Sequence, residues 1–185
     1  MEKQAQLNYL ESIRRLFLYY KKLGEQAMAQ LNDEELAAKP EPESNSMSII
    51  VKHLHGNMLS RWTDFLTSDG EKAWRDRDGE FERALEGRAQ VMSAWEEGWN
   101  CVFNAINPLK EEDLLRIVYI RNEGHTVLEA INRQLAHYSY HVGQMVFLAK
   151  QIRGEQWQSL SIPKGQSETF NQEKFSREKG RKHFG

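Results

Sequence analysis

The sequence has little of what several classes of protein require. It contains one cysteine, Cys101, so it can form neither an internal disulfide nor a cysteine-rich zinc site. Its 25 basic residues are outnumbered by 27 acidic ones, and the net charge of −2 argues against a general nucleic-acid-binding protein. The chain opens without an apolar signal region, and its longest uncharged run, residues 134–149, is too short and too polar to span a bilayer. We therefore expect a cytoplasmic protein that binds neither nucleic acid nor membranes.

Proline is also scarce, with four residues in 185, and apolar side chains recur at steps of three and four over four long segments. This spacing predicts helices over residues 3–31, from Ser46 or Ser48 to about Thr67, over 81–106 and over 126–152. The charged stretch 68–80 is typical of a surface loop, and the β-branched run 117–120 predicts an extended segment.

Four long helices with apolar stripes indicate an all-α fold, a four-helix bundle with a long excursion between the third and fourth helices. We expect one bundle domain over residues 1–157 and a polar C-terminal tail, 158–185, packed on the surface or partly disordered. The stripes predict a core that includes Phe17, Leu54, Trp62, Leu85, Met92, Trp95, Leu135, Val142 and Met145.

The fourth helix carries the most informative polar residues. His137 and His141 are four positions apart and therefore project from one face, which Glu129, Arg133 and Gln144 share. Two imidazoles at this spacing can bind one divalent metal ion, and imidazole suits nickel and zinc. The simpler alternative is a pair of hydrogen-bonded core histidines. Two ligands do not complete a metal site, so a third must come from another segment.

The second helix offers His53 and His55, which lie about 200° apart on a helical wheel and cannot both face one point. His55 borders the apolar stripe, which favours its burial. His53 shares its side with Gly56, Asn57 and Ser60, the small polar residues that a cavity over a metal ion would use. Periodicity alone leaves the choice open.

Two segments carry a resemblance to a known family. Residues 48–54, which end in His53-Leu54, and residues 137–144, which read HYSYHVGQ, resemble the DinB/YfiT-like superfamily of metal-binding four-helix bundles. The stretches 61–66, 74–77 and 157–163 resemble one uncharacterised bacterial subfamily within it. The resemblance implies that His53, His137 and His141 bind a divalent ion, with Gln144 at the motif's glutamine position. His55 does not match the family pattern.

The resemblance also implies a function, because some members are metal-dependent hydrolases and others transfer groups with a low-molecular-weight thiol. We expect a metal-dependent enzyme that acts on a small molecule, with thiol transfer ahead of hydrolysis. Apart from Glu129, no carboxylate lies beside the histidines in sequence to manage the proton of a bound water. Asn57, Glu129, Arg133 and Gln144 are candidates to contact the substrate or support the ligands, and Arg133 would orient an anionic group.

The alternative is a non-catalytic, metal-stabilised dimeric protein. In either case we expect a homodimer, because aromatic and apolar residues exceed what one bundle must bury. Phe17 and Tyr20, or Trp99, are the side chains predicted to supply the interface.

Overall fold

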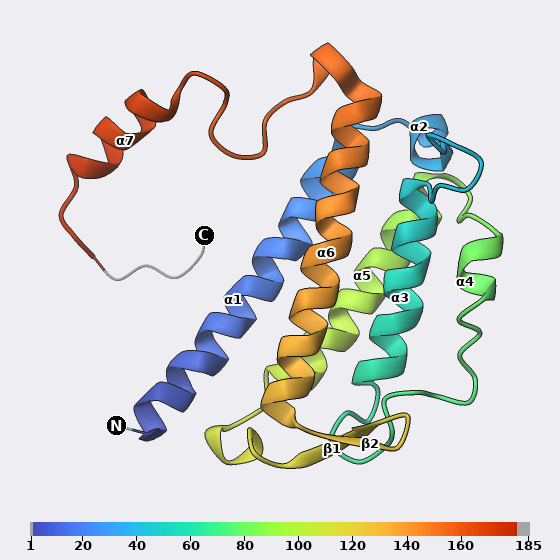
Figure 1. The fold of residues 1–185 in the computed structure, drawn as a ribbon, viewed down its shortest axis with the longest axis vertical. Coiled ribbons are helices and arrows are strands. Elements are labelled where there is room, and N and C mark those ends of the chain that lie inside the picture. Colours follow the sequence, from blue (N-terminus) through green and yellow to red (C-terminus); the bar gives the residue numbers. More distant parts are fainter. Residues whose placement is uncertain (1, 181–185) are drawn as a thin grey trace.

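The computed structural model describes residues 2–180, so the last five positions of the predicted tail lie outside the described residues. Helices and strands follow one another in this order: α1 (Glu2–Ala29), α2 (Asp33–Ala37), α3 (Met47–Trp62), α4 (Gly79–Glu82), α5 (Gly87–Ile106), η1 (Glu111–Asp113), β1 (Ile117–Ile120), β2 (Glu123–Thr126), α6 (Val127–Arg153), η2 (Gly154–Gln156) and α7 (Ser167–Phe175). The four long helices, α1, α3, α5 and α6, lie side by side, with α1 packed on α6 and α3 on α5 (Figure 1). The predicted four-helix bundle is confirmed.

Local sequence signals start two of these helices. Ser46 caps α3 by accepting a hydrogen bond from the backbone N–H of Ile49. Thr126 and Glu129 form a reciprocal capping box at the start of α6, in which each side chain accepts from the other's backbone N–H. These caps define the first residues of the two helices that carry the histidines.

The core is built around large aromatic side chains. Six of the predicted core residues are at most 2% exposed, namely Phe17, Leu54, Trp62, Trp95, Val142 and Met145. The remaining three, Leu85, Met92 and Leu135, are partly buried and pack against this core. Phe17 contacts the rings of Trp62, Trp99 and Tyr138 at 5.9–6.1 Å between centroids. Because Phe17 and Trp99 are fully buried, the prediction that they supply a dimer interface is wrong.

Two predicted helix boundaries are also wrong. The second helix ends at Trp62 rather than near Thr67, because Thr63 is extended and Asp64 adopts a positive φ of 51°. The third helix begins at Gly87 rather than Phe81, because Arg83 and Glu86 are extended and Gly87 has a φ of 68°. Phe81 belongs instead to the short α4, beside α3.

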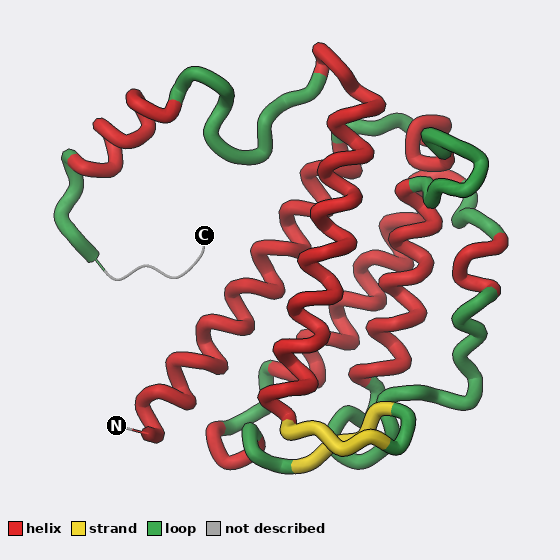
Figure 2. The backbone as a smooth tube through the Cα atoms, in the orientation of Figure 1, coloured by secondary structure: helices red, strands yellow, loops and turns green. Residues whose placement is uncertain are grey.

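The predicted extended run 117–120 forms β1, which pairs antiparallel with β2 (Figure 2). Arg121 and Asn122 connect the strands with φ of 57° and 63°, the left-handed pair of a tight hairpin turn. Asp69 accepts their backbone N–H groups at 2.9 and 2.8 Å. The hairpin is thereby tied to the segment that follows α3, which places Arg121 near that segment.

The tail leaves the far end of α6. Gln158 still exchanges hydrogen bonds with Gln30, the residue that follows α1. Beyond it, residues 161–180 are exposed, and α7 stands away from the bundle (Figure 1). None of the described residues is part of a helix long and apolar enough to cross a membrane.

Candidate metal centre

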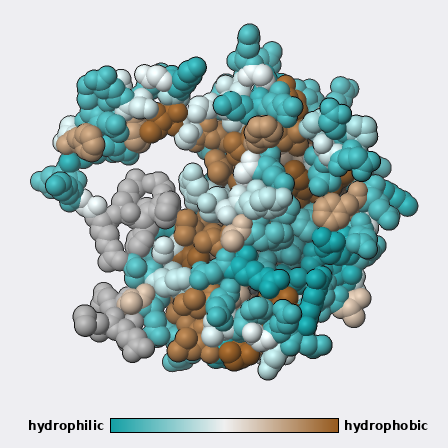
Figure 3. Space-filling view, in the orientation of Figure 1, coloured by the Kyte–Doolittle hydropathy of each residue, from teal (hydrophilic) through white to brown (hydrophobic). Residues whose placement is uncertain are grey.

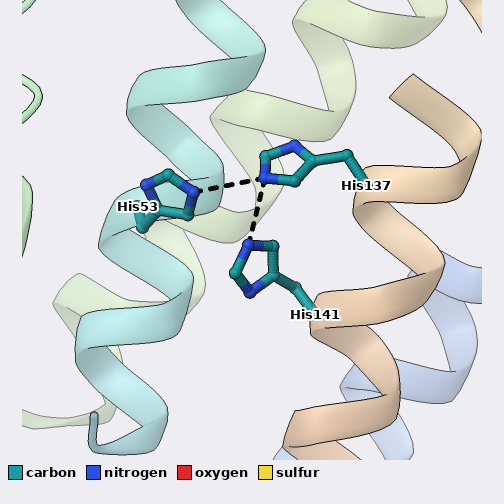
Figure 4. A group of neighbouring side chains, drawn as sticks. All are labelled: His53, His137 and His141. Carbon is teal, nitrogen blue, oxygen red and sulfur yellow. Dashed lines mark hydrogen bonds between the residues drawn. The ribbon is translucent and has the colours of Figure 1, made fainter. Parts of the chain in front are cut away.

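Three histidines from two helices meet between α3 and α6. His53 projects from α3, and His137 and His141 project from successive turns of α6, so that the three rings point toward one another (Figure 4). Nε2 of His137 lies 3.3 Å from Nε2 of His53 and 3.0 Å from Nε2 of His141. One ring nitrogen from each of the three lies within 4.8 Å of the other two.

These spacings fit a divalent metal ion. Zinc–nitrogen bonds of about 2.05 Å in tetrahedral geometry separate ligand nitrogens by about 3.3 Å. The observed Nε2–Nε2 separations of 3.0 and 3.3 Å are close to that value. Three neutral nitrogens of this kind suit zinc or nickel.

His53 is oriented by a buried carboxylate. Its Nδ1 lies 2.8 Å from Oε2 of Glu80, and because a carboxylate only accepts hydrogen bonds, Nδ1 carries the proton. Nε2 therefore presents its lone pair to the other two histidines. Glu80 in turn accepts two hydrogen bonds from Arg75, at 2.8 and 3.1 Å. The ring of Phe81 packs against His53 with centroids 4.8 Å apart.

The charge of Glu80 is maintained although its side chain is only 6% exposed. Burial alone would raise the pKa of this carboxyl group, but hydrogen bonds from His53 and Arg75 and the positive charge of Arg75 lower it below its ordinary value. Gly56 makes room for the carboxylate, because a Cβ atom at that position would lie 2.2 Å from Oε1 of Glu80.

His141 is oriented in a similar way by an amide. Its Nδ1 donates to Oε1 of Gln144 at 2.8 Å, and Nε2 of Gln144 donates to the Tyr140 hydroxyl at 3.0 Å. Burial, with the neighbouring histidines, lowers the pKa of His137 to about 3 and that of His141 to about 4. Both rings are therefore neutral at pH 7, which is the form that binds metal.

A second polar chain ties the site to the core. Nε1 of Trp62 donates to the Tyr138 hydroxyl at 2.8 Å, which donates to Oδ1 of Asn57 at 3.1 Å. Burial raises the pKa of Tyr138, so the phenol stays protonated and able to donate. Asn57 is thereby held in place at the wall of the histidine pocket.

The histidines line a pocket of about 490 Å³ between α3, α6, the α3–α4 segment and the hairpin turn. Of the residues proposed to support the ligands or contact a substrate, Asn57, Arg133 and Gln144 also line it. Glu129 does not, because it is exposed and caps α6 with Thr126. The expectation that Glu129 serves the site is wrong, and its sequence position three residues after a threonine is the signal of the capping box.

His55, the alternative ligand on α3, points away from the pocket. Nε2 of His55 lies 2.9 Å from Oε2 of Glu97 on α5, and Glu97 is 62% exposed. The side of α3 lined by Gly56 and Asn57 is therefore the side that faces the pocket, and it carries His53.

Sequence reasoning missed Arg75 and Glu80, because the stretch 68–80 reads as a solvated loop. In the structure Glu80 is buried, and the side chain of Arg75 is 3% exposed. No spacing rule connects Glu80 to a histidine 27 positions earlier. The available signal is indirect: Glu80 stands directly before Phe81, the first residue of an apolar pattern.

Comparisons with known proteins agree with this fold. A crystal structure of a DinB-like protein from Bacillus cereus ATCC 10987 superimposes with a TM-score of 0.53 at 16% sequence identity, over 78% of this chain and 90% of that one. No curated protein matches the chain. The model of a family described as a protein of unknown function, DUF1572, matches residues 4–166. The chain therefore belongs to the DUF1572 family and has a DinB-like fold.

Proposed function

We propose that this protein is a divalent-metal-dependent enzyme that acts on a small molecule, with transfer to or from a low-molecular-weight thiol ahead of hydrolysis. The observation that carries the proposal is the convergence of three imidazole nitrogens, from His53, His137 and His141, on one wall of a polar pocket. These residues would hold nickel or zinc. A bound ion would act as a Lewis acid that lowers the pKa of a thiol or of water.

The chain's own residues prepare this site in two ways. Glu80 and Gln144 fix the histidine tautomers, so that both Nε2 lone pairs face the centre. Arg133 stands one helical turn from His137 and lines the pocket, where it would orient an anionic group of the substrate or the thiol.

The lack of a free carboxylate at the pocket, among the described residues, favours thiol transfer over hydrolysis. Hydrolysis generally uses a free carboxylate to accept a proton from water. Glu80 lies near the histidines, but both of its oxygens are occupied by His53 and Arg75. Among residues 2–180, no aspartate or glutamate lines the pocket. A thiol needs no such base, because its lower intrinsic pKa brings the thiolate within reach near neutral pH.

Cobalt spectroscopy tests the proposal. We would load untagged protein with cobalt and titrate it with 2-mercaptoethanol, while recording the near-ultraviolet charge-transfer absorption of a cobalt–sulfur bond. The band is expected to appear and saturate in the wild type, and to be absent from the variant with alanine at positions 53, 137 and 141. No band with 2-mercaptoethanol in the wild type would overturn the proposal and favour a non-catalytic, metal-stabilised dimeric protein.

The proposal includes a cytoplasmic homodimer, with an interface other than the one first expected. Tyr140 and Phe147 of α6 are 61% and 70% exposed and lie seven residues apart on one face, with Gly143 between them. A second copy of the chain would bury this apolar strip. Light scattering at tens of micromolar is expected to give the dimer mass for the wild type and the monomer mass for Phe147→Glu. A monomer mass for the wild type would overturn the proposed homodimer.

A further inference from the structure

The wall of the histidine pocket is unusually cationic. Five arginines from four separate segments line it: Arg61 on α3, Arg75 and Arg77 between α3 and α4, Arg121 at the hairpin turn and Arg133 on α6. Packing of the helices does not require guanidinium groups from distant parts of the chain to meet at one pocket. Their convergence points to a ligand.

Two carboxylates only partly offset these charges. Glu71 lies 3.0 Å from Arg61, 3.1 Å from Arg121 and 3.7 Å from Arg75, and Glu80 pairs with Arg75. Neither of these carboxylates lines the pocket. Even when the exposed Asp78 beside Arg77 is counted, five positive groups face three negative ones, so an excess of about two positive charges remains before any metal ion is counted.

Two of the arginines are available to a ligand. Arg133 has no ion pair or hydrogen bond within the part of the chain that the structure describes. The ion pair of Arg77 is with Asp78 at 3.5 Å, and both side chains are more than half exposed, so this pair is weak.

The floor of the pocket has unused hydrogen-bonding capacity as well. Arg61 is 7% exposed and Gln134 is 4% exposed, and both line the pocket. Nε of Arg61 and Oε1 of Gln134 are buried without a hydrogen-bond partner among the described residues. Both residues also line a smaller cavity beside Val118 and Ala130, so these two atoms belong to the inner side of the pocket wall and the anion contacts are left to the accessible arginines.

We propose that this pocket binds a small dianion, a dicarboxylate or a phosphate monoester, held by Arg77 and Arg133 beside the three histidines. Guanidinium groups form paired, charge-assisted hydrogen bonds with both kinds of anion. A polar pocket lined by one sign of charge also concentrates such ligands, and the surface over α3 and α4 in Figure 3 is predominantly hydrophilic. The inference rests on the proposed function in one respect: the dianion belongs to the substrate or thiol of that reaction.

Calorimetric titration of the metal-free and the zinc-loaded protein tests the inference. The probes are succinate, ethyl phosphate and the neutral isostere succinamide. One or both anions are expected to bind at least tenfold more tightly than succinamide, and the tighter one identifies the class of ligand. Arg77→Gln and Arg133→Gln are each expected to weaken anion binding about tenfold. The matched control is Arg15→Gln on α1, whose arginine pairs with Glu11 outside the pocket and whose loss is expected to change nothing.

Anion affinities equal to that of succinamide, or unchanged in both pocket variants, would overturn the inference. Its failure is distinguishable from failure of the proposed function. The neutral thiol 2-mercaptoethanol tests the cobalt centre without the arginines, and succinate with metal-free protein tests the arginines without the metal. Succinate binding that persists without any cobalt–thiol band supports the dianion site and refutes only the proposed reaction.

Discussion

Replacement of Glu80 by glutamine tests whether the buried carboxylate positions the metal ligand His53. The variant keeps the size of the side chain and an oxygen that can accept from His53, but it removes the negative charge. Arg75, whose side chain is 3% exposed, then loses its closest counter-ion. Breaking a buried ion pair by removing one partner costs about 3–5 kcal/mol. We expect about 3 kcal/mol, because Glu71 remains 3.7 Å from Arg75.

The effect on metal binding is separate from the effect on stability. Loss of a partner that orients a metal-binding histidine typically lowers metal affinity about 10- to 100-fold. Urea unfolding of the metal-free protein measures the effect on stability, and competition with a chelating zinc indicator measures the effect on zinc affinity. The matched control is Glu97→Gln, which also removes a carboxylate from a histidine, His55, but at an exposed position. It is expected to cost about 0.5 kcal/mol or less and to leave zinc affinity unchanged.

Two results would refute this reasoning. Zinc affinity equal to that of the wild type would show that Glu80 does not position His53, even if stability falls. Equal losses of affinity in Glu80→Gln and Glu97→Gln would show that the effect arises from net charge rather than from the contact with His53.

Three further perturbations probe the packing around the site. Gly56→Ala places a Cβ 2.2 Å from the buried carboxylate of Glu80, so it is expected to lower the free energy of unfolding by about 1–3 kcal/mol and to weaken zinc binding. Gly143→Ala, at a glycine with open space around it, is expected to leave the free energy of unfolding unchanged or to raise it by up to about 1 kcal/mol, and urea unfolding compares the two variants. The side chain of Met145 is fully buried, so Met145→Ala is expected to lower the free energy of unfolding by about 2–5 kcal/mol. Met92 is partly buried, so Met92→Ala is expected to lower it by less than half as much, and equal losses would contradict the burial pattern. Burial alone would raise the pKa of Asp69, but backbone N–H donors lower it below its ordinary value, so the contribution of this carboxylate to stability is present above about pH 3.9 and lost as pH falls further. The difference in unfolding free energy between wild type and Asp69→Ala is therefore expected to narrow below that pH, and a constant difference would contradict this prediction.

The sequence predicted what helical periodicity controls. The spacing of Phe17, Trp95 and Met145 identified core faces, and the four-residue interval placed His137 and His141 on one face of α6. Such relations lie within one helix and need no knowledge of the tertiary fold.

What could not be predicted depends on contacts between distant segments. Arg75 lies in the irregular segment between α3 and α4, and Glu80 lies in the short α4. This part of the chain is held by ion pairs to α3 and by hydrogen bonds of Asp69 to the hairpin turn. Charged residues in such a stretch are usually solvated, so composition predicts exposure, whereas here the pairing of charges permits burial. The choice between His53 and His55 needed the same information, because periodicity left it open and only the resemblance selected His53.

The most direct test of the central claim is the metal content of three proteins, purified without a histidine tag and equilibrated with zinc or nickel before desalting. Elemental analysis is expected to find one equivalent of metal in the wild type and in His55→Ala, whose histidine pairs with Glu97 away from the pocket. His53→Ala is expected to retain little metal, because it removes one of the three converging nitrogens. Full metal content in His53→Ala, or none in the wild type, would contradict the account.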